Sequence, residues 1–183
     1  MNRPMRAAPR MTTAEFLALP ETPDGSRLEL LDGEVLAMNP PSRAHQRVAL
    51  RVASALLVWT DAATGRGEVL PEIGVDPGSA SILVPDIQRF AAGRDLPADA
   101  RAWPVGDLVV EVRSESTARY DREVKRERYL EAGAREVWLV DPLTAAVVVT
   151  RPGEPDALLG PGETLTSPLL PGFSLPLARL RVD

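Results

Sequence analysis

The sequence predicts an α/β fold, in which a mixed β-sheet is flanked by helices and preceded by an N-terminal β-hairpin. The first observation behind this prediction is the order of the elements: a hairpin is followed by a helix, three strands, a second long helix and further strands. Such an alternation is typical of a mixed sheet with helices packed on it. The second observation is that the strands are short apolar runs, which indicates that they are buried.

Length and composition limit the classes of protein to consider. The chain has 183 residues, 44% of them hydrophobic and 26% charged, as in an ordinary globular domain. It contains no cysteine and one histidine, which excludes disulfides, thiolate zinc sites and a multi-histidine metal site within one chain. No apolar run approaches the roughly 20 residues of a membrane helix, and the basic segment 1–10 lacks the apolar core of a secretory signal. We therefore expect a cytoplasmic protein with a flexible tail over residues 1–11 and a single domain over residues 12–183.

Turn residues, helix caps and periodicity define the individual elements. Asp32-Gly33 between two apolar segments is the strongest hairpin signal, and Ser42 can cap the helix that follows. That helix has one apolar stripe, expected to face the core, which is formed by Val48, Val52, Leu56 and Trp59. The expected elements are, in order, helix 13–19, hairpin 27–38, helix 43–62, edge strand 68–75, strand 81–87, strand 108–112, helix 118–132 and strands 137–140 and 146–150. The segment 151–183 is punctuated by proline and glycine, and its leucines predict that it packs on the rest of the domain.

Two acidic residues lie in segments that should be buried. Glu111 follows the apolar run Leu108–Val110, and Asp86 follows another apolar run and Pro85. An unpaired carboxylate in an apolar interior costs several kcal/mol or takes up a proton. Two such acids on neighbouring strands therefore indicate that a cation binds between them.

The residue types narrow the cation and its chemistry. Carboxylate ligands without sulfur suit a hard cation such as Mg²⁺ or Mn²⁺, whose bound water can act as the nucleophile in phosphodiester hydrolysis. A cationic side chain is expected nearby. Arg113 stays protonated and can clamp a phosphate, whereas Lys125 shares a helix face with Asp121 and Tyr129 and can reach the scissile phosphate if that face points at the strand ends.

In their order and spacing, these motifs resemble the Uma2 family of endonucleases, which have a restriction-endonuclease-like PD-(D/E)xK core. The resemblance extends from about Thr12 to about Leu180, and Arg113 departs from it because the family more often has an apolar residue there. The motifs that carry it are Glu29–Gly33, Pro40-Pro41, His45, Pro85-Asp86, Val110-Glu111-Val112, Ser114, Ser116-Thr117, Asp121, Lys125, Tyr129, Gly133, Glu136–Pro142 and Leu170–Phe173.

The resemblance implies a restriction-endonuclease-like fold and a divalent-metal-dependent nuclease activity. It implies that Asp86 and Glu111 are the metal ligands, with Mg²⁺ or Mn²⁺ as cofactor, and that Lys125 is the catalytic lysine. DNA is the expected substrate. A homodimer is expected because two-fold symmetry suits the cleavage of both strands of a duplex.

Each candidate residue also has a purely structural interpretation. Asp86 can cap a turn, Glu111 can be a salt-bridged structural acid, and Lys125 can pair with Asp121 on a solvated helix face for only about 0.3–0.5 kcal/mol. His45 and Arg113 are further candidates for substrate binding. Glu29 is another, although a strand acid beside a hairpin more often lies at the surface or supports its neighbours.

Two functions from different classes follow from these interpretations. One is a metal-dependent DNA endonuclease, which the intact set Asp86, Glu111 and Lys125 favours. The other is a nuclease fold that no longer cleaves and acts as a binding or regulatory module, which the net charge of −5 favours because nucleic-acid binders usually carry a basic excess. The enzyme requires these three side chains to converge in one cleft.

Overall fold

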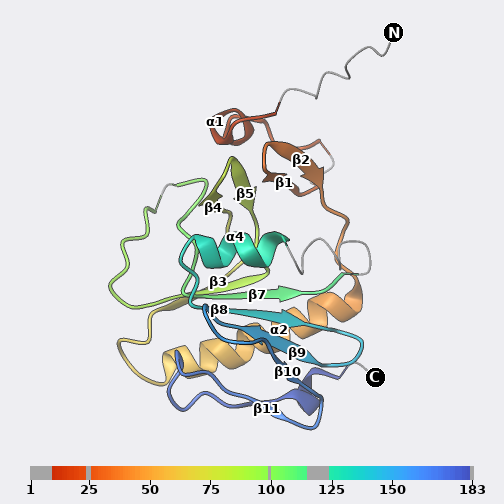
Figure 1. Ribbon diagram of the computed structural model, residues 1–183, viewed down its shortest axis with the longest axis vertical. Coiled ribbons are helices and arrows are strands. Elements are labelled where there is room, and N and C mark those ends of the chain that lie inside the picture. The colour runs from red at the N-terminus through yellow and green to blue at the C-terminus, as the bar shows by residue number, and fades with distance from the viewer. Residues whose placement is uncertain (1–9, 24–25, 99, 115–123, 182–183) are drawn as a thin grey trace.

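The structure, a computed structural model, describes residues 10–23, 26–98, 100–114 and 124–181. A six-stranded mixed sheet forms the centre, a four-stranded antiparallel sheet lies beyond one of its faces, and a two-stranded ribbon lies at the other side of the molecule (Figure 1). The elements are α1 (Thr13–Leu17), β1 (Leu28–Leu31), β2 (Glu34–Ala37), α2 (Arg43–Asp61), β3 (Glu68–Pro71), β4 (Val75–Gly78), β5 (Ser81–Leu83), β6 (Ile87–Phe90), β7 (Leu108–Val112), α4 (Arg126–Glu131), β8 (Glu136–Val140), β9 (Val147–Thr150), β10 (Ala157–Leu159), β11 (Thr164–Leu165), β12 (Leu175–Pro176) and the 3₁₀ helix η2 (Leu177–Leu180).

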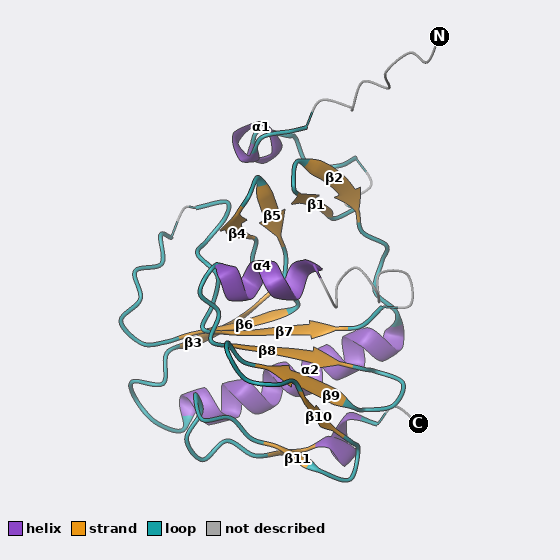
Figure 2. Ribbon diagram, viewed as in Figure 1, coloured by secondary structure: helices purple, strands orange, loops and turns teal. Residues whose placement is uncertain are grey.

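The large sheet has the strand order β10-β9-β8-β7-β6-β3, and the small sheet has the order β2-β1-β5-β4. In the large sheet only β7 and β8 are parallel, and α4 lies on the connection between them. Helix α2 runs along one face of this sheet, and α4 lies on the other face, between it and the small sheet (Figure 2). The predicted fold class, a mixed sheet flanked by helices with an N-terminal hairpin, is confirmed.

Helix α2 forms as its sequence predicts. The Ser42 side chain caps it by accepting a hydrogen bond from the His45 N–H at 3.2 Å. The predicted stripe is buried against the valines of β7 that point to this face, and leucines from the segment 151–183 complete the same core. The stripe consists of Val48, Val52, Leu56 and Trp59, each less than a tenth exposed.

The other face of β7 looks towards α4. Side chains alternate between the two faces along a strand, and Val109 packs with Tyr129 of α4 and with Leu31 and Leu83 of the small sheet. Glu111, two residues after Val109, therefore lies on the same face, between the two sheets.

The segments 68–78 and 81–90 differ from the sequence prediction. Each was expected to contribute one strand, but both form a bent antiparallel ribbon that passes from one sheet to the other. In the small sheet β4 pairs with β5, and in the large sheet β3 pairs with β6. Proline can end strand pairing because it has no N–H to donate, and Pro85 lies at this bend directly before Asp86.

The hairpin, the strands β8 and β9 and the packing of the segment 151–183 on the domain follow the prediction, whereas β10, β11, β12 and η2 within that segment were not predicted. Strands β1 and β2 pair across Asp32-Gly33, with positive φ angles of 48° and 83° at the two turn residues. Met11 N donates to Gly33 O, which joins the start of the described chain to this turn. The predicted helix 118–132 is described only from residue 124, so Asp121 and Ser116-Thr117 lie outside the described residues. None of the helices that the structure describes is both long and apolar enough to cross a bilayer.

Candidate functional site

The strand register brings the two predicted acids together. Strand β6 pairs with β7 so that Ile87 lies opposite Val110, and Asp86, one residue earlier, therefore comes opposite Glu111. Residues directly opposite each other in an antiparallel pair project to the same face. Asp86 is further held by Val112 N, which donates to its Oδ2 at 2.7 Å. The two buried carboxylates thus lie next to each other at the end of β7, on the face towards α4.

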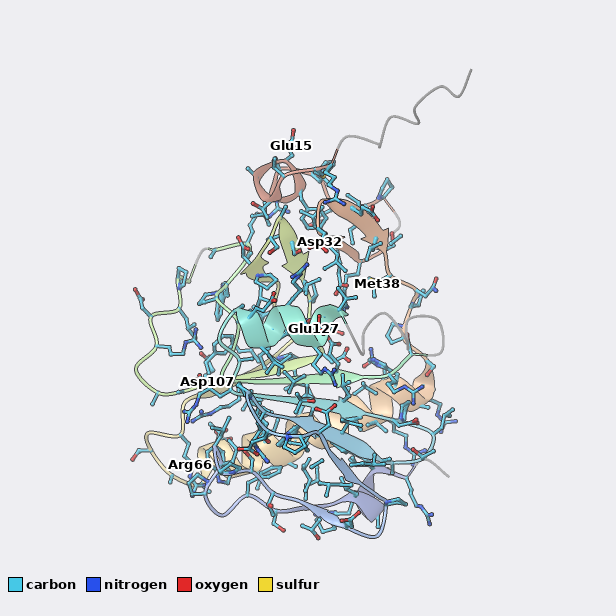
Figure 3. The ribbon with its side chains drawn as sticks, viewed as in Figure 1. Glu15, Asp32, Met38, Arg66, Asp107 and Glu127 are labelled. Atoms are coloured by element: carbon cyan, nitrogen blue, oxygen red, sulfur yellow. The ribbon has the colours of Figure 1, made fainter. Side chains whose placement is uncertain are left out.

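Both acids line a cavity of about 590 Å³ between the two sheets, which we call the central cavity. Its wall comes from five parts of the chain: β1, the segment from β2 into α2, the bend of the ribbon, the end of β7 and the residue before α4. Met38, labelled in Figure 3, belongs to this wall. The polar and charged residues of the wall are Ser26, Arg27, Glu29, Asn39, His45, Glu72, Asp86, Glu111, Ser114 and Lys125.

Lys125 lines the central cavity, where it forms a buried ion pair with Glu29. Its Nζ lies 2.6 Å from Glu29 Oε2, and both side chains are at most 3% exposed. The other carboxylate oxygen, Glu29 Oε1, accepts a hydrogen bond at 3.0 Å from Val84 N, two residues before Asp86. Glu29 is therefore not a surface residue: it connects the lysine to the loop that carries Asp86. The interpretation of Lys125 on a solvated helix face is wrong because the side chain is buried.

Tyr129 contacts Glu111, a role that the sequence analysis missed. Its hydroxyl donates to Glu111 Oε1 at 2.6 Å, and the ring is fully buried. Burial, and then the negative charges of Glu111 and Glu29, raise the pKa of Tyr129 well above its ordinary value, so the hydroxyl remains a donor at physiological pH. The signal in the sequence was its position one helical turn after Lys125.

His45, the only histidine, contacts the other acid. Its Nε2 lies 3.2 Å from Asp86 Oδ2, and the residue is buried at the start of α2. Burial acts to lower the pKa of His45, but the hydrogen bond and the negative charge of Asp86 outweigh it, so the pKa lies above its ordinary value. Within the described part of the chain, its Nδ1 has no hydrogen-bond partner.

Arg113 lies outside the central cavity. Its Nη1 pairs with Asp141 Oδ2 at 2.5 Å, and it lines a second cavity of about 340 Å³. The two cavities are neighbours, since Pro40 and Ser114 belong to the walls of both. Of the six predicted site residues, the structure brings five to the central cavity and places Arg113 beside it.

The donor set fits a hard cation. Among the described residues, no group of three or more His, Cys, Asp or Glu side chains is arranged to hold a metal ion. Mg²⁺, however, is commonly held by one or two carboxylates and keeps several waters. The described side-chain contacts of Asp86 both fall on Oδ2. Asp86 and Glu111 together provide the oxygen ligands that such an ion needs.

Comparisons with known proteins identify the family and a similar fold. Residues 13–178 match the model of the Uma2 family, described as "Putative restriction endonuclease". The fold is similar to the crystal structure of a protein from Anabaena variabilis ATCC 29413, described as "a putative nuclease belonging to DUF820". The TM-score is 0.82 at 21% sequence identity, and the match covers 93% of this chain and 97% of that one. No curated protein matches the sequence. Because the family model covers most of the chain, the protein belongs to the Uma2 family.

Proposed function

We propose that the protein is an endonuclease that depends on Mg²⁺ or Mn²⁺ and hydrolyses phosphodiester bonds of DNA in the central cavity. The observation that carries this proposal is the convergence of Asp86, Glu111 and Lys125 on one cavity in a member of the Uma2 family. A hydrolytic site needs acids and a cationic side chain around one cavity, and these residues provide that set.

Asp86 and Glu111 would hold the metal ion. When bound, the ion supplies a water of lowered pKa and compensates the negative charge that develops on the phosphate. Different partners hold the two carboxylates. The Tyr129 hydroxyl donates to Glu111, and Val112 N and His45 hold Asp86. Such partners orient the ligands and set their affinity for the metal.

Lys125 would place its positive charge beside the reacting phosphate. A preorganised charge in a site with little water stabilises a developing anion more strongly than the same charge in solution. Glu29 fixes the direction of the ammonium group and provides its counter-charge while no substrate is bound. We therefore assign Glu29 as a positioning residue that acts through Lys125, and we keep His45, in the central cavity, and Arg113, in the neighbouring cavity, as candidates for substrate binding.

The alternative function, binding without cleavage, has one observation in its favour. The contact between Lys125 Nζ and Glu29 Oε2 at 2.6 Å is short, and a lysine retained only for this buried ion pair would stabilise the fold without taking part in chemistry. The two functions differ in whether Lys125 affects turnover.

Metal binding and DNA cleavage test the proposal together. Calorimetry with Mg²⁺ and Mn²⁺ should show binding by the wild type and none by Asp86→Asn or Glu111→Gln. Nicking of supercoiled plasmid in Mg²⁺ should be lost in Lys125→Gln. The matched control is Arg126→Gln, which removes a positive charge from the neighbouring position and breaks only a partly exposed ion pair with Asp156.

The results separate the two functions. Metal binding with cleavage that needs Lys125 but not Arg126 supports the nuclease. A wild type that binds DNA and metal but leaves every plasmid and linear duplex intact supports the binding module. Cleavage that persists in both Asp86→Asn and Glu111→Gln would show that the reaction does not use this cavity.

A further inference from the structure

We propose that the outer face of α2 is the interface of a two-fold homodimer, in which the α2 helices of two copies pack antiparallel across Ser54. This inference is independent of the chemistry in the central cavity. It rests on an apolar stripe and on the distribution of charge along one helix.

The apolar stripe faces away from the domain. Leu50, Leu57 and Val58 are 67%, 41% and 73% exposed, and they belong to the few large hydrophobic side chains that the described chain leaves at its surface. They lie at positions i, i+7 and i+8 of α2, which is one side of a helix. The opposite side of α2 is the buried stripe on the large sheet (Figure 1). Helix α2 is therefore apolar on two sides, and the described residues of the domain form a core on only one of them.

The charges on the same helix select an antiparallel partner. Arg43 and Arg47 lie at its N-terminal end and Asp61 at its C-terminal end, and none of the three forms an ion pair within the described residues. A parallel pair would place like charges side by side, whereas an antiparallel pair brings each basic end to an acidic end. It also opposes the two helix dipoles, which is favourable.

A two-fold axis at Ser54 satisfies both observations at once. Leu50 and Val58 lie four residues before and after Ser54, so each Leu50 would contact the partner's Val58. Arg47 and Asp61 lie seven residues before and after it, so each Arg47 would reach the partner's Asp61. Ser54 itself is small and exposed, which allows two helices to approach each other at the axis.

The size of this contact does not by itself determine its strength. Specific dimer interfaces bury roughly 1,200–2,000 Å² in total, and one helix pair reaches only the lower part of this range. Because interfaces of a given area range from roughly micromolar to picomolar affinity, self-association is to be measured from nanomolar to high micromolar protein concentrations.

Sedimentation velocity over a range of protein concentrations tests the interface. The wild type should change from monomer to dimer, and Leu50→Glu should weaken the dimer by about tenfold or more because a charge would be buried at its centre. Leu158→Glu is the matched control, since Leu158 is 70% exposed on β10 and lies outside the proposed interface. A wild type that stays monomeric, or a dimer that only Leu158→Glu weakens, would overturn the proposal.

Charge exchange tests the antiparallel direction. Arg47→Glu and Asp61→Arg should each weaken self-association, because every cross-subunit pair becomes repulsive. A mixture of the two variants should form heterodimers more tightly than either variant forms homodimers, because both pairs are then attractive. Heterodimers no tighter than either homodimer would contradict the register.

The absence of cysteine allows a direct measurement at the axis. Ser54→Cys introduces one thiol per chain, and mild oxidation should cross-link it to the partner's equivalent residue across the axis. Glu21→Cys, at an exposed site after α1, should give little cross-linked dimer under the same conditions. Equal cross-linking of the two variants would show that collisions, not this interface, bring the chains together.

Discussion

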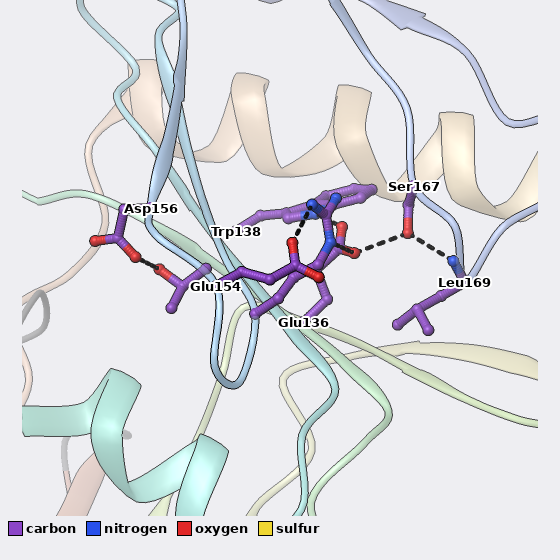
Figure 4. A network of polar contacts seen from close by, with 8 residues as sticks. Glu136, Trp138, Glu154, Asp156, Ser167 and Leu169 are labelled. Atoms are coloured by element: carbon purple, nitrogen blue, oxygen red, sulfur yellow. Dashed lines mark hydrogen bonds and ion pairs between the residues drawn. The ribbon is translucent and has the colours of Figure 1, made fainter.

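Two glutamates on adjacent parallel strands, Glu111 in β7 and Glu136 in β8, are both buried but differ in what surrounds them. Glu136 lies at the start of its strand, where donors occupy both oxygens: Trp138 Nε1 donates to Oε1, while Arg151 Nε at 2.8 Å and Ser167 Oγ at 3.0 Å donate to Oε2 (Figure 4). It does not belong to the wall of the central cavity.

Glu111 lies near the end of its strand and faces the central cavity. Tyr129 holds one of its oxygens, and Asp86, a second acid, is its neighbour across the strand pair. The difference shows that burial of a carboxylate does not by itself indicate function. Glu136 lies among donors away from the central cavity, whereas Glu111 lines that cavity and has a second acid beside it.

The largest expected effect that sharpens this comparison is on cleavage. Glu111→Gln and Asp86→Asn keep the side-chain shapes but each removes one metal ligand. Loss of a residue that only supports a metal ligand costs about 10- to 100-fold in metal affinity or activity. Loss of a ligand itself should cost more, so we expect plasmid nicking to fall by at least about a hundredfold. The unfolding free energy, measured in urea with a chelator present, should change little. Each substitution removes one of two neighbouring negative charges, and the relief of their repulsion offsets the loss of the hydrogen bonds that the carboxylate accepts. A large loss of stability instead would place Glu111 in the same class as Glu136.

Glu136→Gln should have the opposite profile. All three partners of Glu136 donate hydrogen bonds, and an amide offers one acceptor oxygen where the carboxylate offers two. At least one buried donor loses its acceptor, so the unfolding free energy should fall by about 2 kcal/mol. Metal binding by the folded protein should remain at the wild-type level, and calorimetry below the unfolding transition checks this.

Tyr129→Phe should have a smaller effect that is seen mainly in metal affinity. The variant removes the donor to Glu111 but keeps the buried ring, so the fold should persist while the carboxylate loses its fixed direction. We expect the Mg²⁺ dissociation constant to rise by about tenfold. The matched control is Thr60→Val, which removes a hydroxyl of α2 that does not belong to the wall of the central cavity and should leave the metal affinity as it is.

Arg113→Ala should have the smallest effect on stability. Its ion pair with Asp141 is partly exposed, and Asp141 also accepts hydrogen bonds from the N–H groups of Leu143 and Thr144. We therefore expect a loss of less than about 1 kcal/mol in thermal or urea unfolding. If Arg113 contacts the substrate from the second cavity, the KM of Arg113→Ala for DNA should be higher than that of the wild type, while its Mg²⁺ affinity stays the same. An unchanged KM would show that Arg113 only forms the ion pair with Asp141.

The sequence predicted the parts of the fold that local signals determine. The hairpin follows from Asp32-Gly33, whose residues adopt the positive φ angles of a tight turn, and α2 follows from its Ser42 cap and its 3.6-residue period. The bend of the ribbon was not predictable, because whether β5 pairs with β1 or continues towards β7 depends on strands more than 20 residues away.

The same limit applies to the site. Asp86 and Glu111 are recognisable because each interrupts an apolar run, and Lys125 because of its spacing to Tyr129. The contact of Glu29 with Lys125 joins a strand of the small sheet to the residue before α4, and it has no counterpart in local sequence. Only the fold identifies Glu29 as buried and Arg113 as lying beside the central cavity.

Two of the contacts between the small sheet and the start of α4 are ion pairs, and they have a consequence for the order of folding. Lys125 pairs with Glu29, and Arg128 with Asp32, at 2.9 Å; each pair closes a loop of almost a hundred residues. Closing a loop of this length costs conformational entropy before the contact at its ends stabilises the chain. Contacts between residues so far apart in the sequence therefore generally form late. The central cavity should thus be among the last features to form, after β7, β8 and their neighbours have assembled. A partly folded or truncated chain would lack it, so any reaction in the cavity is confined to molecules that have completed folding.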